Sequence, residues 1–150
     1  MLKSSLIYVE NAGRYLMLHR VSKLNDPNRD KWIGVGGKLE PGETPEACAR
    51  REMTEETGLT PIDMAYRGVV MFRSDKWPGE EMHLFTCKEF SGELVPCDEG
   101  VLEWVNKTDV PRLPIWEGDR IFLRLLAEDA PFFRLDLWYH GETLEKWEME

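Results

Sequence analysis

The sequence predicts an α/β fold in which helices cover the faces of a β-sheet. Segments with strand-like apolar patterns occur along the chain, and Gly, Asn, Asp and Pro separate them. Two segments have helical periodicity instead, residues 45–57 and residues 117–128. Strands combined with such helices are typical of a sheet with helices packed on its faces. The 150 residues are expected to form one domain, residues 1–150, since a chain of this length buries roughly 70% of its unfolded surface.

The N-terminal segment predicts a β-hairpin. Residues 6–9 and 15–19 have strand-like patterns, and turn residues lie between them at 11–13. The polar stretch 22–31 follows, with Asn, Asp, Pro and charges of both signs. Its composition predicts a mobile loop at the mouth of a site. Residues 32–36 then lead directly into the segment that contains the first helix.

The helical segment 45–57 has clear signals at both ends. Thr44 is a suitable N-cap, and Pro45 occupies the first helical position, where its missing N–H is not needed. Gly58 follows the last periodic residue and predicts the C-terminal end. The segment therefore predicts a helix of about three turns.

Three glutamates give this helix an acidic face. Glu52, Glu55 and Glu56 are spaced i, i+3 and i+4, so their carboxylates project from one side, beside a buried stripe of Ala49 and Met53. Like charges at these spacings cost a few tenths of a kcal/mol each unless a cation neutralises them. Oxygen ligands favour Mg²⁺, Mn²⁺ or Ca²⁺ over zinc. The helix alone leaves two interpretations, a divalent-metal site or a solvated acidic face.

The segments after this helix extend the predicted sheet. Strands are expected at residues 64–72 and 82–90, with a loop at residues 73–81 between them. A shorter strand is expected at residues 101–105, and Asp109 starts a short turn. These segments therefore add further strands to the predicted sheet.

The C-terminal part predicts an amphipathic helix and a closing hairpin. The hairpin covers residues 132–147 and turns at His140 and Gly141. The helix covers residues 117–128, and its inward face is expected to consist of Ile121, Phe122, Leu125 and Leu126. This helix would cover one face of the sheet.

Charge and cysteine content narrow the class of partner. The net charge of −9 argues against a nucleic-acid polymer or an anionic membrane, because phosphate contacts need clustered Lys and Arg. A small anionic substrate remains possible, since a bound metal reverses the local sign of charge. Cys48, Cys87 and Cys97 are odd in number and form no C-x-x-C, so we expect structural cysteines in a reducing cytoplasm. Neither a signal peptide nor a membrane span is expected.

Residues 37–59, GKLEPGETPEACARREMTEETGL, fit at every fixed position the pattern G-x5-E-x7-R-E-U-x-E-E-x-G-U, where U is a bulky apolar residue. This segment resembles the Nudix box. The resemblance implies a Nudix α/β/α sandwich with a mixed sheet, on which the box forms a loop-helix-loop metal site. It also implies a hydrolase of pyrophosphate bonds in nucleotides.

The resemblance assigns the box residues by position. Mg²⁺, with Mn²⁺ as the alternative, would be bound by Glu52, Glu55 and Glu56 and by the backbone carbonyl of Gly36. Arg51 and Glu43 would support these ligands, because a guanidinium beside crowded carboxylates keeps them ionised and oriented.

Two further residues outside this set are candidates near the metal and the phosphates. In the family an acidic residue ahead of a later strand often completes the metal site or acts as a base, and Glu99 matches by position. Asp98 is adjacent and could take that role, and a solvated loop carboxylate is the alternative for either. Lys38 could add positive charge near the phosphates, or it could be a surface lysine.

A longer resemblance covers nearly the whole chain. The strings LMLHR, KWIGVGGKLE, LPIWEGDRIF and PFF resemble the MutT-like 8-oxo-dGTP diphosphatases. The resemblance implies that Trp116 stacks on a purine and that Asp119 reads its edge; a base stacked on an aromatic ring contributes about 1–3 kcal/mol. The chain departs from this set at two positions, since Gly118 replaces a second Asp and Ile33 replaces a base-contacting Asn. A core role is the alternative for Trp116.

Arg20 and Phe72 complete the candidate binding site by resemblance. Arg20 ends a predicted strand beside the loop and matches a basic position near the nucleotide, and Phe72 matches an apolar wall. A surface arginine and a core phenylalanine are the alternatives.

The expected reaction is hydrolysis of a nucleoside triphosphate, most closely 8-oxo-dGTP, to a monophosphate and pyrophosphate. The resemblance implies attack by a metal-activated water, with Glu52 or Glu99 as the base. Two other functions stay open: hydrolysis of another nucleoside diphosphate derivative, such as ADP-ribose or a dinucleoside polyphosphate, and nucleotide binding without turnover. The oligomeric state and the number of metals do not follow from the sequence.

Overall fold

The computed structural model describes residues 1–21 and 26–150, so part of the expected loop at 22–31 lies outside the described residues. The described residues form nine strands, two α-helices and one 3₁₀ turn at Val110–Arg112. In chain order the strands and helices are β1 (Leu2–Asn11), β2 (Arg14–His19), β3 (Trp32–Ile33), β4 (Val35–Lys38), α1 (Pro45–Thr57), β5 (Thr60–Ser74), β6 (Glu80–Ser91), β7 (Val101–Asn106), α2 (Glu117–Ala127), β8 (Phe133–His140) and β9 (Thr143–Met149).

The sheet is mixed, as the sequence predicts. Its strand order is β3-β2-β1-β6-β5-β8-β9, with β4 paired to β1 and β7 paired to β2. The pairs β1·β6 and β5·β8 are parallel, and the other neighbours are antiparallel. Because β1 pairs with β2, β4 and β6, residues far apart in the sequence meet along this strand.

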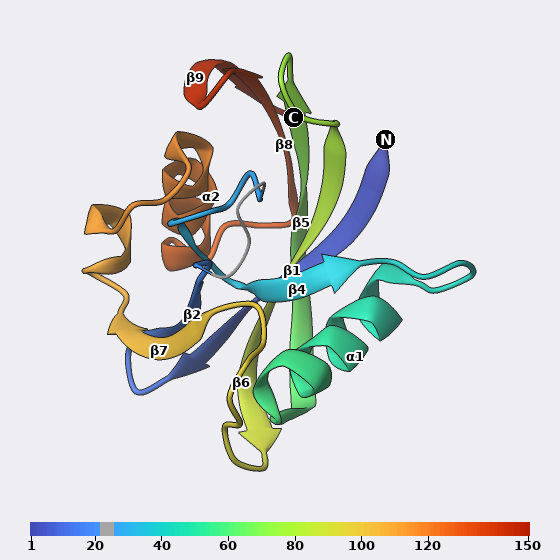
Figure 1. Cartoon of the computed structure of the whole chain (residues 1–150), viewed down its shortest axis with the longest axis vertical. Helices are drawn as coiled ribbons and strands as arrows, with labels where there is room; N and C mark the ends of the chain where they lie inside the picture. The colour runs from blue at the N-terminus through green and yellow to red at the C-terminus, as the bar shows by residue number, and fades with distance from the viewer. Residues whose placement is uncertain (22–25) are drawn as a thin grey trace.

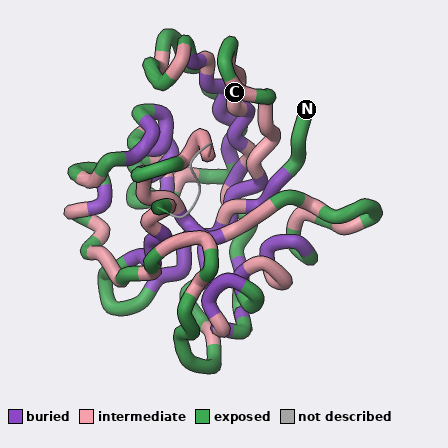
Figure 2. The backbone as a smooth tube through the Cα atoms, in the orientation of Figure 1, coloured by how far each residue is buried: buried purple, intermediate pink, exposed green. Residues whose placement is uncertain are grey.

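The two helices lie on opposite sides of the strands, which gives the expected α/β/α sandwich (Figure 1). Ala49 and Met53 of α1 are fully buried against one apolar cluster, and Phe122 and Leu126 of α2 are buried in a second. The buried residues follow the central strands and the inward sides of both helices (Figure 2). Each face of the sheet therefore has its own core.

Helix α1 begins and ends where its sequence signals predict. The Thr44 Oγ1 accepts a hydrogen bond from the Ala47 N–H at 3.1 Å. Gly58 follows the helix with a φ of 78°, a left-handed conformation that glycine adopts without strain. Both ends are thus fixed by local chemistry, which sets the direction in which the acidic face points.

The loop expected at residues 73–81 is too long at both ends. Arg73 and Ser74 still belong to β5 and pair with β8, while Glu80 and Glu81 already belong to β6 and pair with β1 and β5. Polar residues at strand ends carry no apolar signal, yet their backbone groups bond to neighbouring strands. The connection is accordingly confined to residues 75–79.

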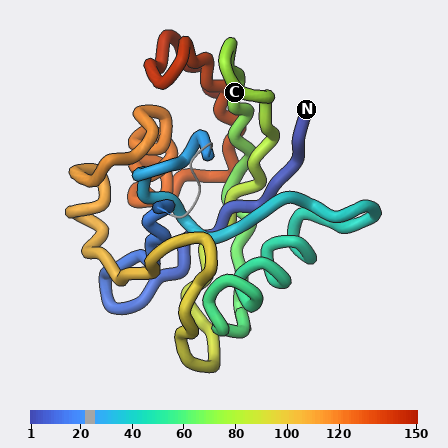
Figure 3. The backbone as a smooth tube through the Cα atoms, in the orientation of Figure 1, coloured from blue at the N-terminus to red at the C-terminus, as the bar shows by residue number. Residues whose placement is uncertain are grey.

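The C-terminal hairpin is confirmed, with β8 and β9 antiparallel (Figure 3). Helix α2 differs from its prediction in its inward face. Phe122 and Leu126 are buried as expected, but Leu123 is buried too, whereas Ile121 and Leu125 are only half-buried. No helix among the residues that the structure describes is long and apolar enough to cross a membrane.

Candidate active site

One cavity of about 790 Å³ brings together most of the candidate residues. Its floor includes side chains of β1, β5, β6 and β8, and α1 and the start of α2 supply parts of its walls. The candidates that line it form two groups by their mutual contacts: Gly36, Glu52, Glu56 and Glu99 form the first, and Phe72, Trp116 and Asp119 form the second. Arg20 and Lys38 also line the cavity. We refer to the two groups as the acidic end and the aromatic end.

Glu55 is the candidate that the structure does not bring into the cavity. Its side chain is 60% exposed and accepts a hydrogen bond from Arg51 NH1 at 3.2 Å. Glu52 and Glu56, by contrast, are largely buried and line the cavity. The three glutamates share the predicted helix face, but they point to different depths.

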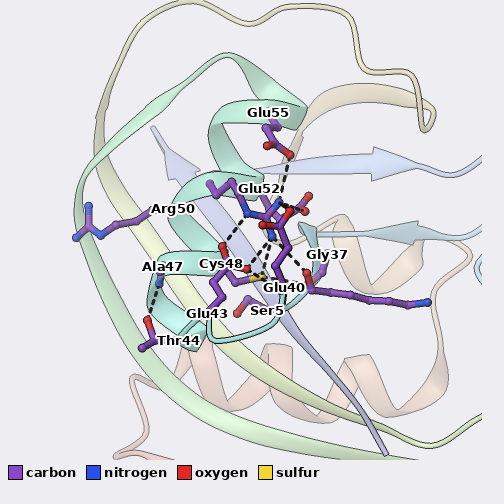
Figure 4. Close-up of polar contacts among 12 residues, drawn as sticks. Ser5, Gly37, Glu40, Glu43, Thr44, Ala47, Cys48, Arg50, Glu52 and Glu55 are labelled. Carbon is purple, nitrogen blue, oxygen red and sulfur yellow. Dashed lines mark hydrogen bonds and ion pairs between the residues drawn. The ribbon is translucent and has the colours of Figure 1, made fainter.

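Arg51 holds the helix and the preceding loop together, as expected. Its Nε and NH2 donate to the two carboxylate oxygens of Glu43 at 2.7 and 2.8 Å, and its NH1 donates to Glu52 Oε1 at 2.7 Å (Figure 4). The guanidinium lowers the pKa of Glu43 to about 2. Glu43 therefore stays ionised and fixes Arg51 beside Glu52.

Burial makes ionisation of the two buried glutamates, Glu52 and Glu56, unfavourable. Burial raises the pKa of Glu56 to about 8, although its carboxylate accepts a hydrogen bond from the Gly36 N–H at 3.2 Å. Burial also raises the pKa of Glu52, despite the hydrogen bond from Arg51. The negative charges of Glu52 and Glu99 add to the shift at Glu56. A cation at the acidic end would relieve both burial and repulsion.

The donors at this end are all oxygens, which suits Mg²⁺ or Mn²⁺. In the part of the chain that the structure describes, no three acidic, His or Cys side chains are close enough together to enclose an ion. Glu52 and Glu55 contact Arg51, and Glu99 contacts Arg20. The carboxylates at this end fit a divalent cation by the chemistry of their oxygen donors.

Glu99, rather than Asp98, faces the cavity. Asp98 is exposed and does not line it. Glu99 Oε2 lies 3.0 Å from Arg20 NH2, and the same guanidinium contacts Asp26 Oδ2 at 2.8 Å. Arg20, which directly follows β2, is thus a link between two carboxylates and not a surface arginine.

Aromatic side chains form the other end of the cavity. The Trp116 ring packs edge-to-face against Phe72, with centroids 5.5 Å apart, and against Tyr139 at 5.0 Å. Trp116 and Phe72 also line the cavity, so the core role and the wall role coexist. Ile33 lines the cavity as well and offers no hydrogen bond, as the sequence indicates.

Asp119 is the buried acid at the aromatic end. It is 6% exposed, and burial raises the pKa of its carboxyl to about 8. Gly118 cannot be replaced by an acid without rearrangement, because a Cβ there would lie 2.5 Å from Leu137 Cδ1 and 2.7 Å from the Tyr139 hydroxyl. The packing therefore leaves no room for a second Asp at position 118, and Asp119 is the acid that lines this end.

Sequence reasoning missed three residues of the polar loop. Asn28 Oδ1 accepts a hydrogen bond from Trp116 Nε1 at 2.8 Å, and Asp26 contacts Arg20. The Lys31 ammonium lies 4.7 Å from the centroid of the Trp116 ring and contacts Glu142. The polar composition indicated a loop near a site, but no local pattern connects Asn28 to a tryptophan 88 positions away.

Lys38, the remaining candidate from the sequence, is exposed at the rim of the cavity.

The buried acid predicts a measurable loss of stability with rising pH. The Asp119 carboxyl has an ordinary pKa of 3.8 and a folded value of about 8, so between these pH values the folded chain holds a proton that the unfolded chain has released. Stability should therefore fall by at most about 1.4 kcal/mol per pH unit in this range. Asp119→Asn should lack this contribution.

Urea unfolding of the metal-free protein at pH 5, 6, 7 and 8 tests this expectation. Glu56 has a shift of the same sign, so the difference between the wild type and Asp119→Asn is the informative quantity. The variant should gain relative stability as the pH rises. Parallel curves for the two proteins would contradict the assignment.

The structure has a mixed sheet between two helices, and an acidic helix whose glutamates contact an arginine lies at one end of a cavity. These features together define a class of phosphate-bond hydrolases. The chain belongs to the NUDIX family: the NUDIX domain matches residues 3–126. The box that the sequence predicts is therefore that of a true family member, and its fold is the family fold.

The relatives and the solved structure that the chain resembles carry different names. The chain is 31% identical over 132 residues to the oxidized purine nucleoside triphosphate hydrolase of Danio rerio, covering 85% of this chain and 81% of that protein. It is 34% identical over 128 residues to the NAD-capped RNA hydrolase NudC of Pseudomonas syringae, covering 83% of this chain but 42% of that protein. The crystal structure of the mutator MutT protein from Bacillus halodurans superposes with a TM-score of 0.88 at 24% identity, covering 100% of this chain and 98% of that one. The chain is accordingly a Nudix hydrolase of the MutT type.

Proposed function

We propose that this protein is a Mg²⁺-dependent nucleoside triphosphate pyrophosphohydrolase that prefers 8-oxo-dGTP and releases 8-oxo-dGMP and pyrophosphate in the cytoplasm. The supporting observation is one cavity that is lined both by carboxylates and by a tryptophan with a buried acid three positions after it. A nucleotide has matching ends, a polyphosphate and a purine. The relative from Danio rerio carries the name of this activity.

The acidic end would hold the metal through Glu52, Glu55, Glu56 and Glu99 and the Gly36 carbonyl, with Mn²⁺ as a possible substitute. When bound, the metal neutralises phosphate charge and lowers the pKa of water. Arg51, held by Glu43, keeps Glu52 in place. Glu52 or Glu99 would accept the proton of the attacking water, since both line the cavity. Arg20 and Lys38 would lie near the phosphates.

The aromatic end would bind the base. Trp116 supplies a flat platform, Phe72 an apolar wall, and Asp119 a hydrogen-bonding group. Because burial raises the Asp119 pKa to about 8, its carboxyl carries a proton near neutral pH and can both donate and accept a hydrogen bond. Such a group can pair with a base edge that presents a donor beside an acceptor, as guanine and its 8-oxo derivative do.

Pyrophosphate release with Mg²⁺ tests the proposal. We would compare kcat/KM for 8-oxo-dGTP, dGTP, the other triphosphates and ADP-ribose, and repeat the panel with Trp116→Ala. We expect the highest value for 8-oxo-dGTP, and for Trp116→Ala a KM raised about 10- to 100-fold, which is the loss of one base-stacking contact. Equal values across all triphosphates would remove the base preference and leave the hydrolase assignment.

A second function has one observation in its favour, the relative named NAD-capped RNA hydrolase. We therefore include NADH and a dinucleoside polyphosphate in the same panel. A higher kcat/KM for these compounds or for ADP-ribose would assign the chain to nucleoside diphosphate derivatives. The absence of turnover for every compound after long incubation with Mg²⁺ would indicate a binding module.

Gly37 offers a test of Glu52 that avoids changing Glu52 itself. A Cβ at Gly37 would lie within 2.7 Å of the Glu52 carboxylate, which is the end of a flexible side chain. Gly37→Ala should therefore displace the carboxylate and leave the fold nearly intact. We expect kcat to fall at least about tenfold, the effect typical of disturbing the support of a metal site, with a melting temperature close to that of the wild type. The control is Ala47→Ser, a small substitution on the exposed face of α1. Gly42→Ala is unsuitable as a control, because Gly42 has a φ of 79° and an alanine there would strain the backbone.

A wild-type kcat in folded Gly37→Ala would show that the position of Glu52 does not limit the reaction. A large drop in melting temperature would instead mean that the Cβ disturbs the backbone of β4.

A further inference from the structure

Arg20 stands between the two ends of the cavity. Its Nε and NH2 both contact Asp26 Oδ2 at 2.8 Å, and its NH2 contacts Glu99 Oε2 at 3.0 Å. The side chains of Arg20 and Asp26 are 15% and 6% exposed, so these charges interact with little solvent between them. One guanidinium is thus shared by two carboxylates, of which Glu99 belongs to the acidic end.

The chain of contacts continues from Asp26 to the aromatic end. Asp26 Oδ1 accepts a hydrogen bond from the Asn28 N–H at 3.0 Å, and Asn28 Oδ1 accepts one from Trp116 Nε1 at 2.8 Å. The same segment is tied to Arg20 by its backbone, since the Arg20 N–H donates to the Lys31 carbonyl at 3.0 Å. Every link from Glu99 to the indole is therefore a polar contact of ordinary length.

We propose that Arg20, Asp26 and Asn28 form a relay that couples cation binding at Glu99 to purine binding at Trp116. A cation bound to Glu99 would break the contact between Glu99 and Arg20, so that Arg20 then pairs with Asp26 alone. A more tightly paired Asp26 would hold the Asn28 N–H, and the Asn28 side chain would hold the Trp116 indole in the orientation on which a base stacks. The three residues are positioning residues. The proposal rests on the proposed function for the two ends of the cavity, but the coupling between them is a separate property.

Direct contact between metal and phosphates would also make the two binding events cooperative, so the test needs a ligand without phosphates. The nucleoside 8-oxo-deoxyguanosine fulfils this condition, because it can reach Trp116 but has no group to bridge to the metal. Its Kd would be measured by NMR titration with and without saturating Mg²⁺. We expect Mg²⁺ to lower the wild-type Kd about fivefold or more, the lower range of measured couplings between sites.

Two variants and a control locate the coupling. In Asp26→Asn and Asn28→Ala the ratio of the two Kd values should fall to about one. The Mg²⁺ affinity of the nucleoside-free protein should stay close to that of the wild type in Asn28→Ala and should weaken in Asp26→Asn, because the Arg20 charge then acts on Glu99 alone. Lys31→Met is the matched control. Lys31 contacts the Trp116 ring and Glu142 by a different route, so its loss should weaken nucleoside binding but keep the ratio.

A second readout needs no nucleoside. The indole N–H resonance of Trp116, assigned with Trp116→Phe, should shift when Mg²⁺ alone is added, because the hydrogen bond to Asn28 changes. The shift should vanish in Asp26→Asn, and the indole resonance of Trp138, which packs on Arg73 and Lys146, should not move in either protein.

The outcomes separate the relay from the proposed function. A wild-type Kd ratio of about one together with an unmoved Trp116 resonance would overturn the relay, even if 8-oxo-dGTP is hydrolysed. A ratio that survives in Asn28→Ala would overturn it as well. A nucleoside that binds under neither condition would remove the base platform itself, and with it the base-reading part of the proposed function.

Discussion

Replacement of Glu56 by Gln is expected to reduce kcat by roughly 10³-fold, because the stabilisation of transition-state charge by a metal amounts to several kcal/mol and each 1.4 kcal/mol is tenfold in rate. Glutamine has the shape of glutamate and can still accept the hydrogen bond from the Gly36 N–H. It lacks the charge that would bind a cation. Because the pKa of Glu56 is raised to about 8 by burial, the neutral side chain should also fold at least as stably as the wild type in the absence of metal.

The measurement is kcat for 8-oxo-dGTP together with the Mg²⁺ concentration needed for half-maximal rate. Glu46→Gln is the matched control, since Glu46 lies on the same helix, is exposed and pairs only with Arg50 among the contacts described for it. The control should keep the wild-type rate. A folded Glu56→Gln protein with the wild-type kcat would remove this residue from the metal site.

Glu55→Gln tests whether every glutamate that the Nudix pattern assigns to the metal takes part in the reaction. Its carboxylate is 60% exposed and lies outside the cavity, held by Arg51. The family pattern nevertheless assigns it to the metal, so we expect loss of turnover with the fold intact. Activity retained in Glu55→Gln, combined with its loss in Glu56→Gln, would restrict the metal site to the residues that already line the cavity.

Replacement of Asp119 by Ala is expected to lower kcat/KM for 8-oxo-dGTP about 100-fold or more, mainly through KM. A buried polar group that pairs with a substrate contributes strongly to its selection, because its loss leaves groups of the substrate unpaired. Gly118 supplies no second carboxylate that could compensate. The preference for 8-oxo-dGTP over dGTP should shrink along with the affinity.

The same experiment with Glu117→Ala controls for the loss of an acidic side chain from the first turn of α2. Glu117 lies two positions before Asp119, but it is exposed and does not line the cavity. Its removal should leave KM nearly unchanged. The wild-type KM should also rise as the pH passes 8, where Asp119 loses its proton, and this rise should be absent in Asp119→Asn. A pH-independent wild-type KM would mean that the protonated carboxyl does not read the base.

The sequence predicts this fold well where local chemistry decides the structure. Thr44 and Gly58 cap α1 as their residue types require, and the helical spacing alone puts Glu52 and Glu56 on one face. It fails where contacts between distant segments decide. The pairing of Arg20 with Glu99, for example, joins segments that are 79 positions apart.

At the aromatic end, too, the sequence predicts the local arrangement but not the contacts between distant segments. The sequence indicates that Trp116 and Asp119 stand close together at the start of a helix, but it contains no sign of the burial that keeps Asp119 protonated. The contact between Asn28 and Trp116 was equally invisible, because an Asn in a polar loop has many possible partners. The proposed base specificity therefore depends on features that only the packed structure shows.

The packing around Gly118 also limits how this enzyme could evolve. Leu137 and the Tyr139 hydroxyl occupy the space that a side chain at position 118 would need, and Tyr139 accepts a hydrogen bond from the Gly118 N–H at 2.7 Å. A Gly118→Asp substitution therefore requires Leu137 and Tyr139 to shift, and a smaller residue at either position would relieve the contact. The route from the present sequence to a second acid beside Asp119 thus passes through two side chains of β8 as well as through position 118.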